Sequence, residues 1–258
     1  MPVVDLPDGS LYYVQKRAPR SSFPPVVLIH GAGGTHLDWP LELRRLPDAH
    51  ILALDLPGHG RSSGPAHDDM LAYAGDVCRF LDAVGISRAI IVGHSMGGAI
   101  AQHTGIHMPD RVAGLVLLGT GSKLPVDPTL PQRIVNEPET TVNWITASAW
   151  SAGAAQTMKD LGRQQLLATA PETLQADYRA CQKFDVRDQI DQIRAPTLVI
   201  GAADDRMVPL KFSQTLKERI PNTTLVIIED AGHMFPLERP AAVADAISHW
   251  IRMQDWTL

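Results

Sequence analysis

The sequence has little that would place the protein in a membrane, on nucleic acid or in a disulfide-bonded scaffold. Only two of its 258 residues are cysteines, Cys78 and Cys181, and they lack metal-ligand spacing, so we interpret them as buried or incidental thiols. No apolar run approaches the length of a bilayer span. The formal net charge of −5 argues against a general affinity for nucleic acid or anionic membranes.

The first residues also lack the features of a secretory leader. Residues 1–5 have neither the basic start nor the long apolar core of a signal peptide, and together with the scarcity of cysteine this predicts a cytoplasmic protein. A chain of this length with 45% hydrophobic and 20% charged residues suits one globular domain with an inserted subdomain. The sequence has no signal for an oligomeric state.

Short apolar runs alternate with helical patterns, which is typical of a mostly parallel sheet covered on both faces. We expect strands at residues 3–6, 11–16, 26–30, 51–54, 89–92, 115–118, 197–200 and 225–228. We expect covering helices at residues 69–84, 97–107, 211–220 and 241–251. Asp8-Gly9 between the first two strands predicts an antiparallel hairpin, and the continuous apolar runs predict strands buried on both faces. The predicted fold class is therefore α/β, with eight strands.

One stretch interrupts this alternation. Residues 122–193 contain no convincing strand, and helical material rich in Ala, Gln and Thr follows an entry made irregular by four prolines. We therefore expect a helical insertion at 122–193 within a core formed by residues 1–121 and 194–258.

Ser95 is the first candidate for a catalytic residue. Residues 93–97 read Gly-x-Ser-x-Gly, directly after an apolar strand and before a helical pattern. A strand that turns into a helix this sharply strains the central residue, and side chains at the two flanking positions would collide with the turn. The pattern predicts that the Ser95 hydroxyl is presented as a nucleophile at the top of a sheet, where the strand ends.

A serine hydroxyl needs a base, and the base needs a carboxylate to orient it. His233 follows the last predicted strand in a Gly-rich turn, where it can reach the serine. Two adjacent aspartates follow the preceding strand. Val208 and Pro209 suggest a register set from the C-terminal side, which favours Asp205; counting forward from Gly201 would select Asp204 instead.

An oxyanion formed during acyl transfer needs backbone N–H donors. Met96 follows the serine at a helix start, where amides are unsatisfied and the helix dipole favours an anion. The loop after an early strand, residues 30–34, supplies the second donor, for which we favour Ala32, with Gly33 as the other candidate. This Gly-rich loop lacks the Lys-Ser/Thr of a phosphate-binding loop, so a nucleotide site is not expected.

These motifs together resemble the serine-dependent α/β-hydrolases, specifically a small member of the esterase type. The resemblance rests on residues 30–33, 55–62, 93–98, 205–209 and 232–233, and it spans nearly the whole chain. It implies Ser95, Asp205 and His233 as the triad, and Ala32 and Met96 as the oxyanion donors. It also implies that residues 122–193 form a helical cap over the substrate pocket.

The implied activity is hydrolysis of small carboxylic esters by water through an acyl-enzyme, without a cofactor. The same residues could act on carbon–carbon bonds, lactones or amides, or form peracids, and a receptor-like protein could bind a small ligand with slow or no turnover. The candidate pocket residues are Gly33, Trp144, Trp150, Met158 and Phe184, of which the last four could equally form the core of the insertion.

Other histidines have structural interpretations. His94, next to the serine, is expected to point into packing, and His59 is expected to act as a turn or hydrogen-bonding residue. His103 and His107 share a helical face, but no third ligand is in register, so no metal site is predicted.

Overall fold

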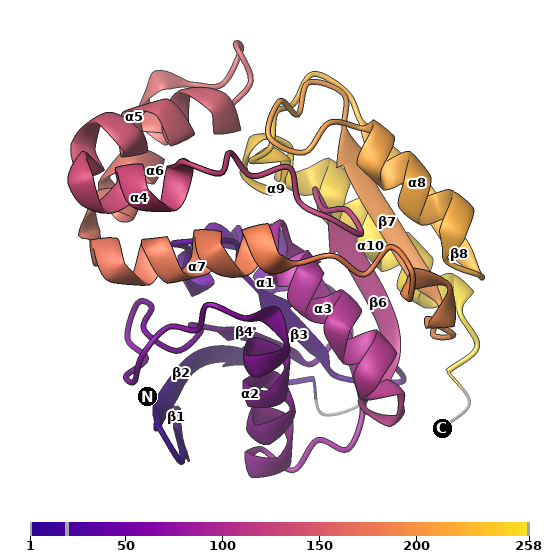
Figure 1. The fold of residues 1–258 in the computed structure, drawn as a ribbon. Helices are drawn as coiled ribbons and strands as arrows, with labels where there is room; N and C mark the ends of the chain where they lie inside the picture. The colour runs from indigo at the N-terminus through magenta and orange to yellow at the C-terminus, as the bar shows by residue number, and fades with distance from the viewer. Residues whose placement is uncertain (1, 19–20, 257–258) are drawn as a thin grey trace.

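A single eight-stranded sheet runs through the centre of the protein (Figure 1). The computed structural model describes residues 2–18 and 21–256. The strands are β1 (Val3–Leu6), β2 (Gly9–Lys16), β3 (Val26–Ile29), β4 (Ile51–Leu54), β5 (Ala89–His94), β6 (Val112–Leu118), β7 (Thr197–Ala202) and β8 (Thr223–Ile228). Their order in the sheet is β1-β2-β4-β3-β5-β6-β7-β8. β1 and β2 form the predicted hairpin, β2 pairs antiparallel with β4, and all other neighbours are parallel.

The α/β-hydrolase fold class predicted from the sequence is confirmed. All eight strands lie where apolar runs predicted them, although several are longer than expected. β6, for example, begins at Val112, three residues before the expected start at 115. Gly114 interrupts the branched apolar pattern, and the pairing with β5 shifts register next to it but continues to Val112. β5 continues to His94, the residue that precedes Ser95.

The helices are α1 (Leu41–Arg44), α2 (Met70–Ala83), α3 (Met96–His107), α4 (Leu130–Asn136), α5 (Pro138–Ala149), α6 (Gln156–Ala168), α7 (Pro171–Lys183), α8 (Lys211–Arg219), α9 (Phe235–Glu238) and α10 (Pro240–Met253). Short 3-10 turns occupy His36–Asp38, Pro109–Arg111 and Ile190–Gln192. Helix α2 begins at an effective cap, because the Asp69 carboxylate accepts hydrogen bonds from the Leu71 and Ala72 N–H groups.

Helices cover the sheet on both faces. Residues of α2, α3 and α8 share one apolar core with one face of the sheet, and residues of α1 and α10 share a second core with the other face. Strand β5 shows the alternation directly, because Ile91 belongs to the first core while Ile90 and Val92 belong to the second. The strand is thus buried on both faces, which explains its continuous apolar sequence.

Helices α4 to α7 lie between β6 and β7 in the sequence and form a separate layer, at the top left of Figure 1. We call residues 122–193 the cap segment. A small apolar cluster holds its helices together, made by Leu130, Ile134, Val142, Ile145, Leu174 and Tyr178. The cap segment therefore has a core of its own and can span the end of the sheet without being part of it.

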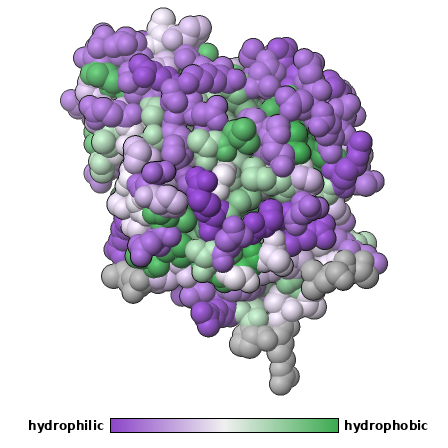
Figure 2. Space-filling view, turned by 60° about the horizontal axis from the view of Figure 1, so that its bottom comes forward, coloured by the Kyte–Doolittle hydropathy of each residue, from purple (hydrophilic) through white to green (hydrophobic). Residues whose placement is uncertain are grey.

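The described helices include none that is both long and apolar enough to cross a membrane. On the face shown in Figure 2, hydrophobic residues lie among hydrophilic ones. Cys78 and Cys181 are both buried and free, in agreement with their interpretation from the sequence.

Candidate active site

Ser95 occupies a sharp elbow between β5 and α3. Its backbone has φ 54° and ψ −115°, a strained geometry for a residue with a side chain. The flanking glycines are required by close approach, since a Cβ at Gly93 would run into the backbone of Gly97, and one at Gly97 into the backbone of Ile29. The strain is therefore held in place by backbone packing on both sides of the serine.

Asp205 and His233 are paired behind this elbow. The Nδ1 atom of His233 donates to Oδ2 of Asp205 at 2.7 Å, and both side chains are almost fully buried. The other oxygen, Oδ1, accepts from the N–H groups of Met207 at 2.9 Å and Val208 at 2.8 Å. All of these donors fix the carboxylate in one orientation, and the proton on Nδ1 leaves Nε2 of His233 as the hydrogen-bond acceptor.

Asp204, the competing aspartate, is exposed and takes part through its backbone alone, its N–H donating to the carbonyl of Ala231 at 3.1 Å. The structure thus brings Asp205, and not Asp204, to His233. The Asp205 side chain is oriented by the turn that it closes, because its carboxylate accepts a hydrogen bond from the N–H of Val208 three residues later.

His94 supports the loop that contains His233. Its Nε2 donates to the carbonyl of His233 at 2.9 Å, and its ring packs edge-on against Phe235. Burial, together with the neighbouring His233, lowers the pKa of His94 to about 3. The ring is therefore neutral, with its proton on Nε2, which agrees with the packing role expected for it.

The loop after β3 and the first residue of α3 approach the serine from the opposite side. A Cβ at Gly31 would lie 3.3 Å from Cβ of Ser95, so this loop passes directly beside Ser95. Met96 is the first residue of α3, where an N–H has no intrahelical partner. The N–H of Gly33 donates to the Asp177 carboxylate at 2.8 Å, so it is already engaged, whereas Ala32 lines the cavity in front of the serine.

Two chambers open onto Ser95 beneath the cap segment. The larger has a volume of about 390 Å³ and the smaller about 170 Å³. The residues that line both chambers are Ala32, Ser95, Tyr178, Met207 and His233. A substrate bond held at Ser95 would therefore have space on each side for a group of different size.

The two chambers differ in chemistry. The walls of the larger are mainly apolar, with Ile145, Met158 and Leu161 among them. Its carboxylate, Asp38, accepts a hydrogen bond from the Gln165 amide, and burial raises the pKa of Asp38 to about 6. The smaller chamber has charged side chains at its rim, Asp127 and Arg206.

The five pocket candidates from the sequence have different positions. Trp150 and Met158 line the larger chamber, and Trp144 lines the smaller one although 44% of its surface is exposed. Phe184 is buried in the core beneath the cap segment, where its ring meets that of His103 edge-on. Gly33 contacts the cap segment, because a Cβ there would meet Leu174 and Leu166.

Sequence reasoning missed the residues that attach the cap segment to the loops of the site. Arg206 donates to the carbonyls of Ala147 and Trp150, and Met234 N–H donates to the carbonyl of Ala149 at 3.0 Å. Asp177 was missed as well, although Leu174, Asp177, Tyr178 and Cys181 follow a helical i, i+3, i+4, i+7 spacing. A carboxylate on that otherwise apolar stripe was the available signal.

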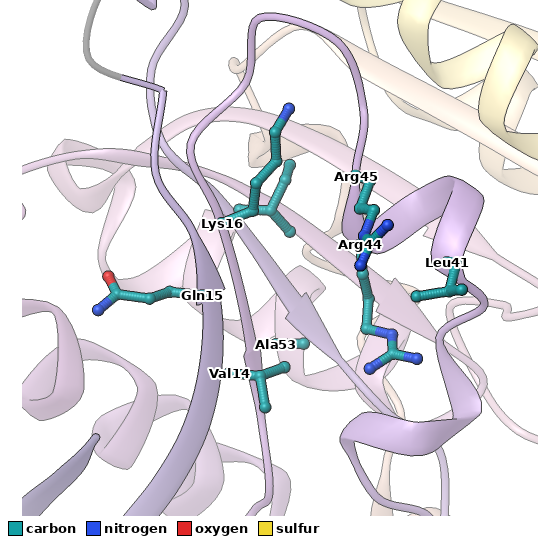
Figure 3. A pocket seen from close by; sticks show the side chains of 8 residues that line it. Val14, Gln15, Lys16, Leu41, Arg44, Arg45 and Ala53 are labelled. Carbon is teal, nitrogen blue, oxygen red and sulfur yellow. The ribbon is translucent and has the colours of Figure 1, made fainter. Parts of the chain in front are cut away.

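A further cavity of about 470 Å³ lies beside β2, β4 and α1 and shares no lining residue with the two chambers. Figure 3 shows Lys16 on one side of it and Arg44 and Arg45 on the other. The cavity contains no nucleophile paired with a base, so it is not a candidate for the reaction centre.

His103 and His107 stack with ring centroids 5.3 Å apart on α3. Within residues 2–18 and 21–256, no group of three or more His, Cys, Asp or Glu side chains is arranged to hold a metal ion. His59 makes hydrogen bonds to Pro57 and Asp177, in keeping with the role expected from its turn sequence.

Residues 26–246 match the family model described as "Alpha/beta hydrolase family". A protein of Caulobacter sp. (strain K31) named "Putative carbamate hydrolase RutD" is 28% identical over 95% of this chain and 96% of its own. A pimeloyl-[acyl-carrier protein] methyl ester esterase of Vibrio atlanticus (strain LGP32) is 28% identical over 87% of this chain and 93% of its own.

A solved structure is similar as well. A thermophilic esterase from Thermogutta terrifontis, with malate bound, superposes with a TM-score of 0.85 at 26% identity, covering 95% of this chain and 93% of that one. The similarity therefore extends through the cap segment as well as the sheet.

Proposed function

The chain belongs to the alpha/beta hydrolase family and is a hydrolase, and from this premise we propose that it cleaves carboxylic esters of small molecules through an acyl-enzyme intermediate. In this proposal Ser95 attacks the ester carbonyl, and His233 takes the serine proton and then delivers it to the leaving alcohol. Asp205 holds the imidazole in the required tautomer. Water activated by His233 then releases the acid.

The observation that supports the triad most strongly is the hydrogen bonding of Asp205. Its carboxylate accepts from three donors, one of which is Nδ1 of His233 at 2.7 Å. A carboxylate held by these donors keeps a fixed orientation toward His233 and stabilises the imidazolium that forms when Ser95 loses its proton. The strained elbow at Ser95 places the nucleophile at the junction of the two chambers, which His233 also lines.

We assign the oxyanion hole to the N–H groups of Ala32 and Met96. Met96 provides a free amide at the start of α3, where the helix dipole adds partial positive charge. Ala32 lies in the loop that passes beside the serine, and its neighbour Gly33 is engaged by Asp177. Two such donors stabilise the tetrahedral intermediate, and losing one donor costs about 10²–10³ in rate in a comparable site.

The chambers favour a substrate with one larger, uncharged apolar group. The larger chamber has apolar walls, and the Asp38 carboxylate, with a pKa of about 6, is ionised at neutral pH and would repel an anionic group. Residues of the cap segment line both chambers, so we propose that residues 122–193 act as the specificity-determining cap over a core of 1–121 and 194–258.

A panel of p-nitrophenyl esters of increasing acyl length tests this proposal. We expect kcat/KM to rise by roughly fourfold per added methylene, from about 0.8 kcal/mol each, until the chamber is filled. A dicarboxylic monoester should react more slowly than a neutral ester of equal length. Equal rates for all lengths and charges would contradict the assignment of the chambers.

A second candidate substrate is a carbamate, which is favoured by the match to the Caulobacter relative over 95% of this chain. Carbamates, lactones and amides present the same carbonyl to Ser95, so each belongs in the panel beside the esters. The highest kcat/KM for the neutral ester would support ester hydrolysis as the activity. A receptor-like protein would show saturable binding of such compounds without release of p-nitrophenol.

A further inference from the structure

The carboxylate of Asp177 connects the cap segment to three parts of the core. Asp177 lies on α7 and is fully buried. Its Oδ2 accepts from the Gly33 N–H at 2.8 Å and from Nε2 of His59 at 2.8 Å. Its Oδ1 accepts from the Tyr73 hydroxyl at 2.7 Å. One cap side chain therefore links the loop after β3, the turn after β4 and helix α2.

The partner His59 is positively charged in this arrangement. Its Nδ1 faces the carbonyl of Pro57 at 2.9 Å, and its Nε2 faces the carboxylate, so both ring nitrogens face acceptors and both must donate. Burial by itself lowers the pKa of His59, but the Asp177 carboxylate outweighs burial and raises it above the usual value. The result is a buried imidazolium–carboxylate pair, with neither side chain exposed.

Two further bonds join the cap segment to the same loop. The Thr169 hydroxyl donates to the carbonyl of Gly33 at 3.0 Å, so both backbone groups of this glycine are held by the cap segment. The Gln165 amide donates to Asp38, whose other oxygen accepts from the N–H of Thr35 at 3.3 Å. Gly33 itself has φ +66° and leaves no room for a Cβ between Leu166 and Leu174.

We propose that Asp177 is a positioning residue for the oxyanion hole: it holds Gly33 so that the preceding amide, Ala32, points at the reacting carbonyl. The inference rests on the proposed function, because it takes Ala32 as an oxyanion donor. It makes the cap segment part of the catalytic geometry as well as the wall of the substrate chambers. An oxyanion donor misplaced by a fraction of an ångström loses much of its effect on the transition state.

Charge makes this attachment strong. Removing the carboxylate alone leaves the His59 imidazolium buried without its partner, which costs far more than losing one neutral hydrogen bond. Replacement by asparagine is gentler, because the amide oxygen can still accept from Gly33 and His59 while the amide nitrogen donates to the Tyr73 oxygen. The asparagine variant should therefore keep more of the loop geometry than the alanine variant.

The test compares Asp177→Ala, Asp177→Asn and Thr169→Val in the full chain. For Asp177→Ala we expect kcat on a p-nitrophenyl ester to fall about 30- to 100-fold with KM changed less than about threefold, as expected when transition-state stabilisation is lost. In Asp177→Asn and in Thr169→Val, kcat should fall by about three- to tenfold. Amide hydrogen exchange at Gly33, which requires no substrate, should accelerate most in Asp177→Ala.

Asp76→Asn is the matched control. It weakens another aspartate–histidine pair, in which the buried Asp76 carboxylate lies 2.6 Å from Nε2 of the partly exposed His67, and Asp76 lies on α2 and does not bond to the loop after β3. This control should lower thermal stability while leaving kcat within about twofold of the original protein. A structural role for Asp177 alone would lower kcat no more than Asp76→Asn does, and that result would overturn the inference.

If Asp177→Ala does not fold, Asp177→Asn and Thr169→Val test the inference. Reduced kcat with faster exchange at Gly33 would support it. Unchanged kcat and unchanged Gly33 exchange in both variants would overturn it. Failure of the proposed function looks different. It would appear as no ester turnover in the original protein, or as turnover that persists in Ser95→Ala, whereas the exchange of Gly33 would still report whether Asp177 holds the loop.

Discussion

At the scale of single residues, Asp204 and Asp205 are adjacent in sequence and opposite in environment. Asp205 is 5% exposed with three hydrogen-bond donors on its carboxylate, whereas Asp204 is exposed to solvent. The sequence suggested two possible registers for this loop. The deciding factor is the turn that the Asp205 side chain closes with Met207 and Val208, a side-chain direction that spacing alone does not specify.

Asp205→Asn should reduce kcat by about 10³–10⁴-fold, because an amide in that position favours the wrong tautomer of His233. Asp204→Asn, its neighbour with the same chemical change, should stay within about threefold of the original kcat. Steady-state kinetics of the two variants on one ester measures this. A greater loss in Asp204→Asn would contradict the proposed triad.

Hydrogen-bond partners also determine the charge of the buried histidines. His30 donates from Nδ1 to the carbonyl of Gly31 and accepts at Nε2 from the N–H of Leu56, so its ring is neutral. Burial and the neighbouring His59 lower the pKa of His30 to about 4. His59, which has acceptors on both nitrogens, is charged. Sequence motifs placed both histidines near turns, but their charges depend on partners that are distant in sequence.

At the scale of elements, the strands and core helices were predictable because burial on both faces produces continuous apolar runs, as in β5. Boundaries were less predictable where a small residue interrupts the apolar pattern, as Gly114 does in β6, since the strand continues past it with a shift of register. The cap segment was recognised by its lack of strands, but the directions of its side chains were not readable. Phe184 shows this, since it faces the core and not the chambers.

The elbow between β5 and α3 makes a specific prediction. Gly97→Ala should destabilise the protein by about 3 kcal/mol or more, because the new Cβ meets the backbone carbonyls of Ile29 and His30, which cannot rotate away. Gly105→Ala, on the same helix, meets the end of the Leu115 side chain instead. Its cost should stay within about 1 kcal/mol, since alanine favours the helix.

Urea unfolding of the two glycine variants, followed by circular dichroism, compares their free energies of unfolding. Equal losses of stability in both would mean that close backbone approach does not hold the elbow.

At the scale of the whole molecule, the cap segment is attached to three of the loops that form the site. Asp177 and Thr169 bind the loop after β3, Arg206 joins the loop after β7, and the Met234 N–H joins the loop after β8. None of these contacts follows from a local motif. They connect segments up to 144 residues apart, which is why the sequence predicted the presence of a cap segment but not its attachment.

The buried neutral histidines make stability depend on pH. His94 and His30 have folded pKa values of about 3 and 4, below the 6.5 of the unfolded chain. The unfolded state therefore binds more protons, and stability falls as the pH drops from about 6.5 towards 4. His59 acts oppositely: its raised pKa stabilises fully below about pH 6.5, and that contribution is lost as the pH rises through the folded value.

His94→Gln isolates one of these groups, since glutamine can still donate to the carbonyl of His233. Between pH 4.5 and 6, the slope of unfolding free energy against pH should be smaller in the variant by about one proton. Chemical unfolding at a series of pH values measures it, and the contribution of other groups, including Asp38, cancels in the difference. Identical slopes would contradict a neutral, buried His94.

The central claim is that Ser95 forms an acyl-enzyme, and rapid mixing with a p-nitrophenyl ester tests it most directly. The account predicts a burst of p-nitrophenol approaching one equivalent per chain when deacylation is the slower step, with the acyl mass found on Ser95 after acid quenching. Both signals should disappear in Ser95→Ala. Turnover that persists in Ser95→Ala, or an acyl group found on another residue, would contradict it.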